Sequence, residues 1–142
     1  MLGGQSVDVE NDGKEISREM LDYIYRNKTS ALIEAAMMIG AQLAGTSEEQ
    51  IAAAEKAAGD IGMAFQIQDD VLDVIGNEAL LGKPIHSDEK NEKTTYVTLL
   101  GIDKAEKIVE KESVEAIELL KSLPVRNDYL EWLLTQLIHR KK

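Results

Sequence analysis

The sequence predicts an all-α protein, and three observations carry that prediction. The 142 residues are dominated by Ala, Leu, Ile, Glu and Lys, with 4% aromatic residues and 2 prolines, which is a helix-forming composition. Apolar residues recur at helical spacing along most of the chain. No stretch alternates apolar and polar residues in the way that a half-buried strand requires. The length suits one compact domain.

Capping residues divide the chain into helices. Residues 1–14 are polar and glycine-rich, so we expect a loop or a fraying helix end there. Ser17, Thr46 or Ser47, and Asp128 are placed to cap the helices that follow them. The expected helices cover, in chain order, residues from about 17 to 45, 47 to 75, 94 to 120 in two pieces that meet near Gly101, and 128 to 138.

Two segments stand out from this pattern. Residues 76–93 contain Gly82, Pro84 and a dense run of charges, so we expect a mobile loop. Residues 28–43 are apolar or small on nearly every side, so we expect that helix to be buried all round. Such a helix belongs at the centre of a larger body. We therefore expect either a homo-oligomer or a longer polypeptide.

Composition excludes several classes of function. The formal net charge is −10. We therefore do not expect nucleic-acid binding, because the chain would repel phosphate backbones. The absence of cysteine excludes disulfides, cysteine–zinc sites and thiol catalysis. We find no apolar run long enough to span a bilayer and no signal peptide, and we expect a soluble cytoplasmic protein.

The most informative stretch is the apolar helical segment 61–75, which carries three carboxylates. At about 100° per residue, Gln66, Asp69, Asp70 and Asp73 fall within about 100° of one another. Buried carboxylates need a positive partner, and Mg²⁺ prefers carboxylate oxygens and commonly bridges to substrate phosphates. These three aspartates are therefore predicted magnesium ligands. The alternative is a solvated acidic patch at the end of an amphipathic helix.

Lysines elsewhere could meet the phosphates of a substrate. Lys28 and Thr29 begin the apolar segment, where an inward-pointing lysine needs an anion, although a lone lysine is more often a surface residue. Lys83 and Lys93 flank the charged loop, which could close over a bound anion or could simply be solvated. Together with the aspartates, these residues predict a diphosphate site, with apolar helix faces beside it for a hydrocarbon tail.

These motifs, in this order, resemble the trans-type polyprenyl diphosphate synthases, and among them the bacterial farnesyl diphosphate synthases. The resemblance extends over nearly the whole chain. The matching segments are Gly4-Gln5 with Asp8 for the G-Q-x-x-D segment, Lys28-Thr29 for the K-T pair, residues 65–73 for the second aspartate-rich motif, and Gly82-Lys83-Pro84 with residues 93–96 for the loop after it.

The resemblance implies head-to-tail prenyl transfer, in which an allylic diphosphate ionises and the double bond of isopentenyl diphosphate attacks the cation. It also implies that residues 1–142 form the C-terminal half of an isoprenoid-synthase bundle. Asp69, with Asp70 and Asp73 directly or through water, would hold Mg²⁺ on the allylic diphosphate. The other implied roles are diphosphate binding by Lys28, Lys83 and Lys93, contact with the tail by Phe65, a place near isopentenyl diphosphate for Arg140, and stabilisation of the cation by the Lys28 carbonyl, Thr29 and Gln66.

The sequence lacks the family's first aspartate-rich motif, which is a D-D-x-x-D followed by an Arg-Arg pair. It has one D-D-x-x-D, at residues 69–73, and no Arg-Arg pair. We therefore expect little or no activity from the isolated chain. One alternative is a non-catalytic or split-enzyme helical partner of a chain that carries the first motif. Another is a fragment of a class I terpene cyclase, against which the K-T pair and the G-K-P loop argue.

Overall fold

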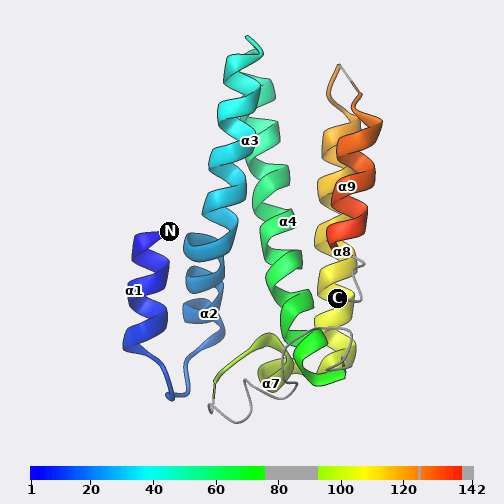
Figure 1. The fold of residues 1–142 in the computed structure, drawn as a ribbon. Helices are drawn as coiled ribbons and strands as arrows, with labels where there is room; N and C mark the ends of the chain where they lie inside the picture. The colour runs from blue at the N-terminus through cyan, green and yellow to red at the C-terminus, as the bar shows by residue number, and fades with distance from the viewer. Residues whose placement is uncertain (76–92, 125, 139–142) are drawn as a thin grey trace.

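The computed structural model describes residues 1–75, 93–124 and 126–138, and every regular element within these ranges is a helix, as predicted (Figure 1). The expected loop therefore lies outside the described residues, apart from Lys93. None of the helices described is both long and apolar enough to cross a membrane. In chain order they are α1 (Leu2–Glu10), α2 (Arg18–Tyr25), the π-helix η1 (Arg26–Ser30), α3 (Ala31–Leu43), α4 (Glu48–Ile75), α7 (Tyr96–Leu100), α8 (Ile102–Lys121) and α9 (Asp128–Ile138).

The long helix α4 is the centre of the fold. It runs antiparallel to the continuous column made by α2, η1 and α3, while α8 and α9 cover its other side (Figure 1). Its buried residues contribute to two apolar clusters at different heights. The lower cluster includes Leu21, Ile24, Tyr25, Met63, Ile67, Val71 and Tyr96, and the upper includes Ala57, Ile61, Ala116, Leu120 and Leu134.

Local capping chemistry explains where most helices begin. Ser17 accepts a backbone N–H from the first turn of α2 at 3.3 Å. Ser47 and Gln50 form a reciprocal capping box at the start of α4, with distances of 3.3 and 3.0 Å. The last helix differs by one residue from the prediction. Asn127, rather than Asp128, accepts a first-turn N–H at 3.0 Å, because the acidic residue already lies inside the helix.

The first segment forms a regular helix over Leu2–Glu10, where the expectation was a loop or a fraying helix end over residues 1–14. α1 lies against α2 and η1 (Figure 1), and its one buried residue is Gly4. The backbone of Asn27 and Lys28 faces that glycine. The low helix propensity of this glycine-rich segment is therefore overridden by tertiary packing, which a propensity argument does not include.

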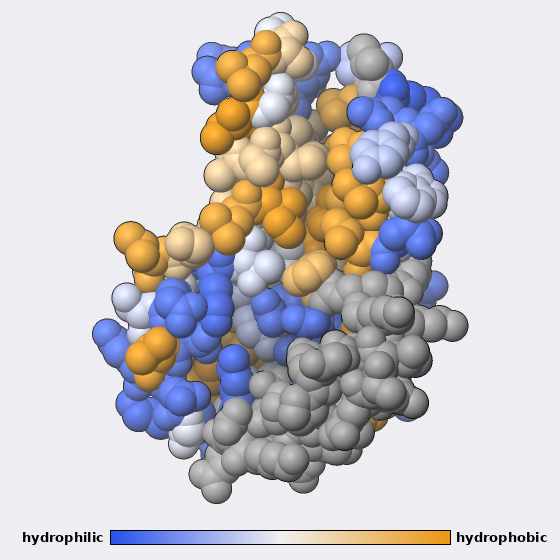
Figure 2. Space-filling view, viewed as in Figure 1, coloured by the Kyte–Doolittle hydropathy of each residue, from blue (hydrophilic) through white to orange (hydrophobic). Residues whose placement is uncertain are grey.

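The expectation that residues 28–43 are buried all round is wrong. α3 has no buried residue, and Leu32, Ile39 and Leu43 are 53%, 58% and 83% exposed. Only Ile33 and Met37 on this helix join the upper cluster. Figure 2 shows apolar residues gathered over α3 and α9 on the viewed face. The described chain thus supplies neighbours for one side of α3 and leaves the other side uncovered.

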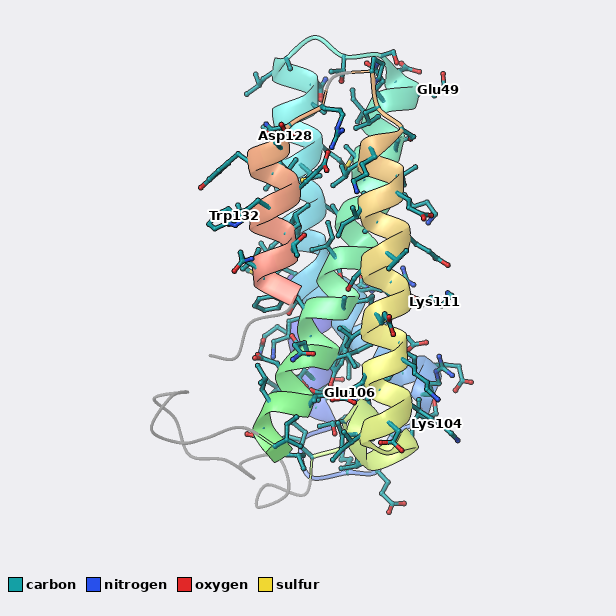
Figure 3. The ribbon with its side chains drawn as sticks, turned by 90° about the vertical axis from the view of Figure 1, so that its right-hand side faces the viewer. Glu49, Lys104, Glu106, Lys111, Asp128 and Trp132 are labelled. Atoms are coloured by element: carbon teal, nitrogen blue, oxygen red, sulfur yellow. The ribbon has the colours of Figure 1, made fainter. Side chains whose placement is uncertain are left out.

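The partly buried carboxyl group of Glu34 on α3 should make the stability of the fold depend on pH. Burial and the nearby Glu55 raise the pKa of Glu34 above its usual value of 4.5, although Arg26 opposes them. A raised pKa in the folded state means that folding disfavours the ionised carboxylate. The protein therefore loses stability as pH rises through that pKa. Glu34→Gln should therefore raise the Tm at pH 7, and the gain should shrink as pH falls through the raised pKa and vanish below about 4.5. Glu106→Gln, at an exposed position on α8 (Figure 3), is the control in a thermal melt series.

Candidate functional site

The π-helix η1 sits between α2 and α3 and contains both members of the predicted Lys-Thr pair. An extra residue within a helical turn is uncommon and is often found at functional sites. Arg26–Ser30 forms this turn, so that Lys28 and Thr29 leave the regular register of the flanking helices. Their side chains point to two different helices, α1 and α4.

Two lysines from distant parts of the chain meet one carboxylate. Lys28 Nζ lies 2.5 Å from Asp8 Oδ2, and Lys93 Nζ lies 3.7 Å from Asp8 Oδ1. The lysine side chains are about one-third exposed, at 34% and 33%, whereas that of Asp8 is 15% exposed. Asp8 therefore holds two partly accessible ammonium groups close together. This pair of cations suits an anion with more than one charged oxygen.

Thr29 and Gln66, both predicted to act in one site, are in contact. The Thr29 hydroxyl donates a hydrogen bond to Gln66 Oε1 at 2.7 Å. This bond joins η1 to the stripe of α4 that also carries the aspartates. Phe65, the neighbour of Gln66, is half-buried.

An apolar cavity adjoins Lys28, one member of the cationic pair. It measures about 270 Å³, and its polar rim includes Lys28 and Thr29. Leu2 and Leu32 form apolar parts of its wall. Their exposed fractions are 80% and 53%, respectively. The arrangement places charged, hydroxyl and apolar groups along one surface, which suits a ligand with an anionic head and a hydrocarbon tail.

The three aspartates of α4 have different surroundings. Asp70 is 4% exposed, and its Oδ2 accepts hydrogen bonds from the Tyr25 hydroxyl at 2.7 Å and from the Tyr96 N–H at 3.1 Å. Asp73 is 2% exposed, while Asp69 is half-buried. Successive helical residues point about 100° apart, which is why Asp69 and Asp70 differ so much.

No group of three or more His, Cys, Asp or Glu side chains among the described residues is arranged to hold a metal ion. The predicted magnesium ligands therefore do not form a ready-made site of three carboxylates. One of them, Asp70, is buried and accepts hydrogen bonds from Tyr25 and Tyr96. Mg²⁺ commonly takes one or two carboxylates and completes its shell with water and phosphate oxygens. The half-buried Asp69 fits that requirement, so magnesium binding at this face of α4 stays a prediction.

Tyr96 was not assigned a role from the sequence, yet it ties three helices together. Its N–H binds Asp70, its hydroxyl donates to Asp22, and its ring lies 5.7 Å from the Arg18 guanidinium carbon. Burial and the hydrogen bond to Asp22 raise the pKa of the Tyr96 hydroxyl. In the sequence, Tyr96 was noted only as the last residue of the K-T-T-Y segment, which resembles a loop motif. That resemblance does not indicate which residues Tyr96 contacts.

The Tyr25–Asp70 hydrogen bond leads to a stability prediction. Tyr25→Phe keeps the ring and removes one donor from a buried carboxylate, so the free energy of unfolding should fall by about 1–3 kcal/mol. Tyr23→Phe is the matched control on the same helix, because Tyr23 is 46% exposed. Its cost should stay within about 0.5 kcal/mol. Equal costs in urea titrations of the two variants would show that the Tyr25 hydroxyl contributes nothing at this position.

Two predicted site residues, Lys83 and Arg140, lie outside the described residues. Of the others, the residues on η1 and Lys93 contact side chains of α1 or α4, whereas Asp70 and Asp73 are buried in the core. Lys28, Thr29, Gln66 and Lys93 take part in the contacts above, and Asp69 and Phe65 lie on the same stretch of α4. Asp8 is the residue whose role was missed, since the G-Q-x-x-D match named it without a partner.

The fold and the site thus define an all-α bundle in which two lysines share one carboxylate and one of these lysines lines an apolar cavity. Residues 1–127 match the family model described as Polyprenyl synthetase. The chain is 40% identical to farnesyl diphosphate synthase of Escherichia coli strain K12 over 146 aligned residues, which cover all of this chain and 49% of that protein. The chain therefore belongs to the polyprenyl synthetase family. It spans about half the length of the curated relatives it matches, their C-terminal half.

Solved structures give the same fold. A geranyltransferase from Helicobacter pylori, complexed with magnesium and isoprenyl diphosphate, matches with a TM-score of 0.79 and 27% identity over 97% of this chain and 45% of that one. Heptaprenyl diphosphate synthase from Staphylococcus aureus matches with a TM-score of 0.92 and 23% identity, covering 99% of this chain and 56% of that one. The second likeness supports the fold alone.

Proposed function

We propose that this chain supplies one half of a prenyltransferase, the half that binds the diphosphate of an allylic substrate. The observation that carries the proposal is the meeting of Lys28 and Lys93 on Asp8, next to an apolar cavity of about 270 Å³. In the proposed reaction the allylic carbon–oxygen bond breaks and diphosphate leaves. The double bond of isopentenyl diphosphate forms the new carbon–carbon bond, and a proton is lost.

The chain's own residues have separable tasks in this proposal. Lys28 and Lys93, with Lys83, bind the diphosphate as point charges. The Lys28 carbonyl, Thr29 and Gln66 face the developing allylic cation with oxygen atoms, and a short hydroxyl–amide bond of 2.7 Å keeps two of them oriented. The remaining proposed roles are a tail contact for Phe65 and a place near isopentenyl diphosphate for Arg140.

Magnesium at Asp69, with Asp70 and Asp73 directly or through water, would stabilise charge on the leaving diphosphate. The buried Asp70, whose Oδ2 is bonded to Tyr25 and Tyr96, suits the indirect role. The half-buried Asp69 suits the direct one. We propose that the isolated chain is inactive, because the sequence contains one aspartate-rich motif and the family uses two.

A split-enzyme partner is the second candidate function, and the uncovered face of α3 favours it. Leu32, Ile39 and Leu43 are more than half exposed, and a separate chain carrying the first motif would cover them. A covalent continuation would cover them equally well. Both arrangements restore the same site, so one experiment can address them together.

The test is transfer of labelled isopentenyl diphosphate onto geranyl diphosphate with MgCl₂. It would use this chain alone, mixed with the N-terminal half of the Escherichia coli relative, or joined behind that half. We expect no product from the chain alone and product from the joined protein. Activity in the mixture as well would favour the split enzyme.

The joined protein also tests Asp69. Asp69→Asn should lower its rate by about a hundredfold or more, whereas Asp103→Asn, at an exposed position in the first turn of α8, should not. A folded joined protein without activity, or an equal rate in the two variants, would contradict the proposal.

A further inference from the structure

Two glycines on different helices lie against the π-helix η1 at backbone distance. A Cβ at Gly4 of α1 would lie 2.5 Å from Asn27 C and from Lys28 N. A Cβ at Gly62 of α4 would lie 2.5 Å from Ser30 Cα. Real Cβ contacts are almost never this short, so any larger residue at either position would displace the turn.

Other observations at the same place show how closely the turn is held. Gly4 and Gly62 are buried, and Ser30 is 0% exposed. Its Oγ has no hydrogen-bond partner within the part of the chain that the structure describes. Glycine is unfavourable within a helix relative to alanine. Its presence in the middle of α4 therefore has a local reason, the close approach of Ser30.

Each glycine is followed four residues later by a side chain that binds a residue of the turn. On α1, Asp8 follows Gly4 and pairs with Lys28 at 2.5 Å. On α4, Gln66 follows Gly62 and accepts the Thr29 hydroxyl at 2.7 Å. Positions i and i+4 share one face of a helix. The same spacing thus places a contact glycine and a binding side chain beside the turn from both helices.

We propose that Gly4 and Gly62 are positioning residues that hold η1 at contact distance, and so fix Lys28 and Thr29 in the diphosphate site. The inference rests on the proposed function and adds to it the device that orients these two residues. An added methyl group at either glycine would move the turn away from α1 or α4. Lys28 would then no longer be held toward the bound anion, and Thr29 would lose its place beside it.

Matched alanine variants on each helix test this device. Gly3→Ala is the control for Gly4→Ala, because its Cβ would meet only the Tyr23 hydroxyl oxygen, at an ordinary 3.6 Å. Gly59→Ala is the control for Gly62→Ala. Its Cβ would come within 2.8 Å of Glu34 Oε1, the end of a flexible side chain that can turn away.

The readout is the affinity of the full chain for inorganic pyrophosphate in MgCl₂, measured by calorimetric titration. We expect Gly4→Ala and Gly62→Ala to weaken binding by about tenfold or more, which corresponds to loss of one charge-assisted contact. The two controls should bind within about twofold of the unmodified protein. Circular dichroism of each variant establishes that it is folded.

A double-mutant cycle with Lys28→Ala separates positioning from general destabilisation. If Gly4 acts through Lys28, then Lys28→Ala should cost much less in the Gly4→Ala background than in the unmodified protein. If Gly4→Ala merely lowers the folded fraction, Lys28→Ala should cost the same factor in both. The second result would overturn the positioning role.

The Ser30 position gives a milder test that applies even if a glycine variant does not fold. Ser30→Ala should bind pyrophosphate like the unmodified protein, whereas Ser30→Thr adds a methyl group at the Gly62 contact and should weaken binding. Equal binding by these two, or by each glycine variant and its control, would overturn the inference. Absence of pyrophosphate binding in the unmodified protein would instead overturn the proposed function, and this inference with it.

Discussion

Replacing Lys28 by alanine is expected to weaken magnesium-dependent binding of inorganic pyrophosphate by about 10- to 150-fold. This range corresponds to loss of one hydrogen bond to a charged group, about 1.5–3 kcal/mol. Lys28 is suited to this role because its ammonium group is about one-third exposed yet held 2.5 Å from Asp8. A diphosphate would therefore meet a cation whose position is already fixed.

Lys111→Ala is the control for this charge removal. Lys111 lies on α8 (Figure 3), where its side chain is 64% exposed and pairs with Glu112 and Glu115. Both variants change the net charge equally, so a difference between them measures the site and not the overall field. Equal affinity of the two variants in calorimetric titrations would exclude Lys28 as a binding residue.

Ile67→Ala is expected to produce the largest loss of stability, about 2–5 kcal/mol in the free energy of unfolding. Ile67 is 0% exposed and belongs to the lower cluster. Truncating its side chain would leave a cavity in the lower cluster, to which α2 and α7 also supply residues. Urea unfolding followed by circular dichroism measures the change.

Ile39→Ala makes the same chemical change at a position that is 58% exposed on α3. In a monomer it should cost less than about 0.5 kcal/mol. A cost close to that of Ile67→Ala would mean that α3 is covered in solution, as expected for a homo-oligomer. Size-exclusion chromatography of the unmodified protein gives an independent measure, and a monodisperse monomer would argue against self-association.

Local patterns predicted the bounds of α4 and the junction of α7 with α8, because caps and breaks depend on neighbouring residues. The capping box at Ser47 and Gln50 opens α4, and Ile75 ends it, as the pattern indicated. Gly101 separates α7 from α8 with a φ of +83°, a backbone conformation that favours glycine. Each of these features is encoded within a few residues.

Contacts between helices were predictable only where the family resemblance named both partners. Thr29 and Gln66 were placed in one site on that basis, and they are in contact at 2.7 Å. The π-turn was not predicted, and the contacts that it makes are with Gly4 and Gly62 on helices distant in sequence. The same limit applies to Tyr25, whose bond to Asp70 follows from packing and not from local periodicity.

The exposure of α3 has a different cause. Periodicity indicates that a side of a helix is apolar, but it does not say whether the same chain supplies a neighbour. Residues 28–43 are apolar on most sides, and the described part of the chain packs against one of them. The apolar surface in Figure 2 is therefore consistent with a body larger than these residues.

The most direct test of the account is a calorimetric titration of the unmodified chain with inorganic pyrophosphate, with and without MgCl₂. We expect saturable binding in magnesium that is lost in EDTA and weakened in Asp69→Asn, while Asp103→Asn, at an exposed position on α8, binds normally. Binding that is the same with and without magnesium, or no binding at all, would contradict a magnesium-dependent diphosphate site on this face of α4.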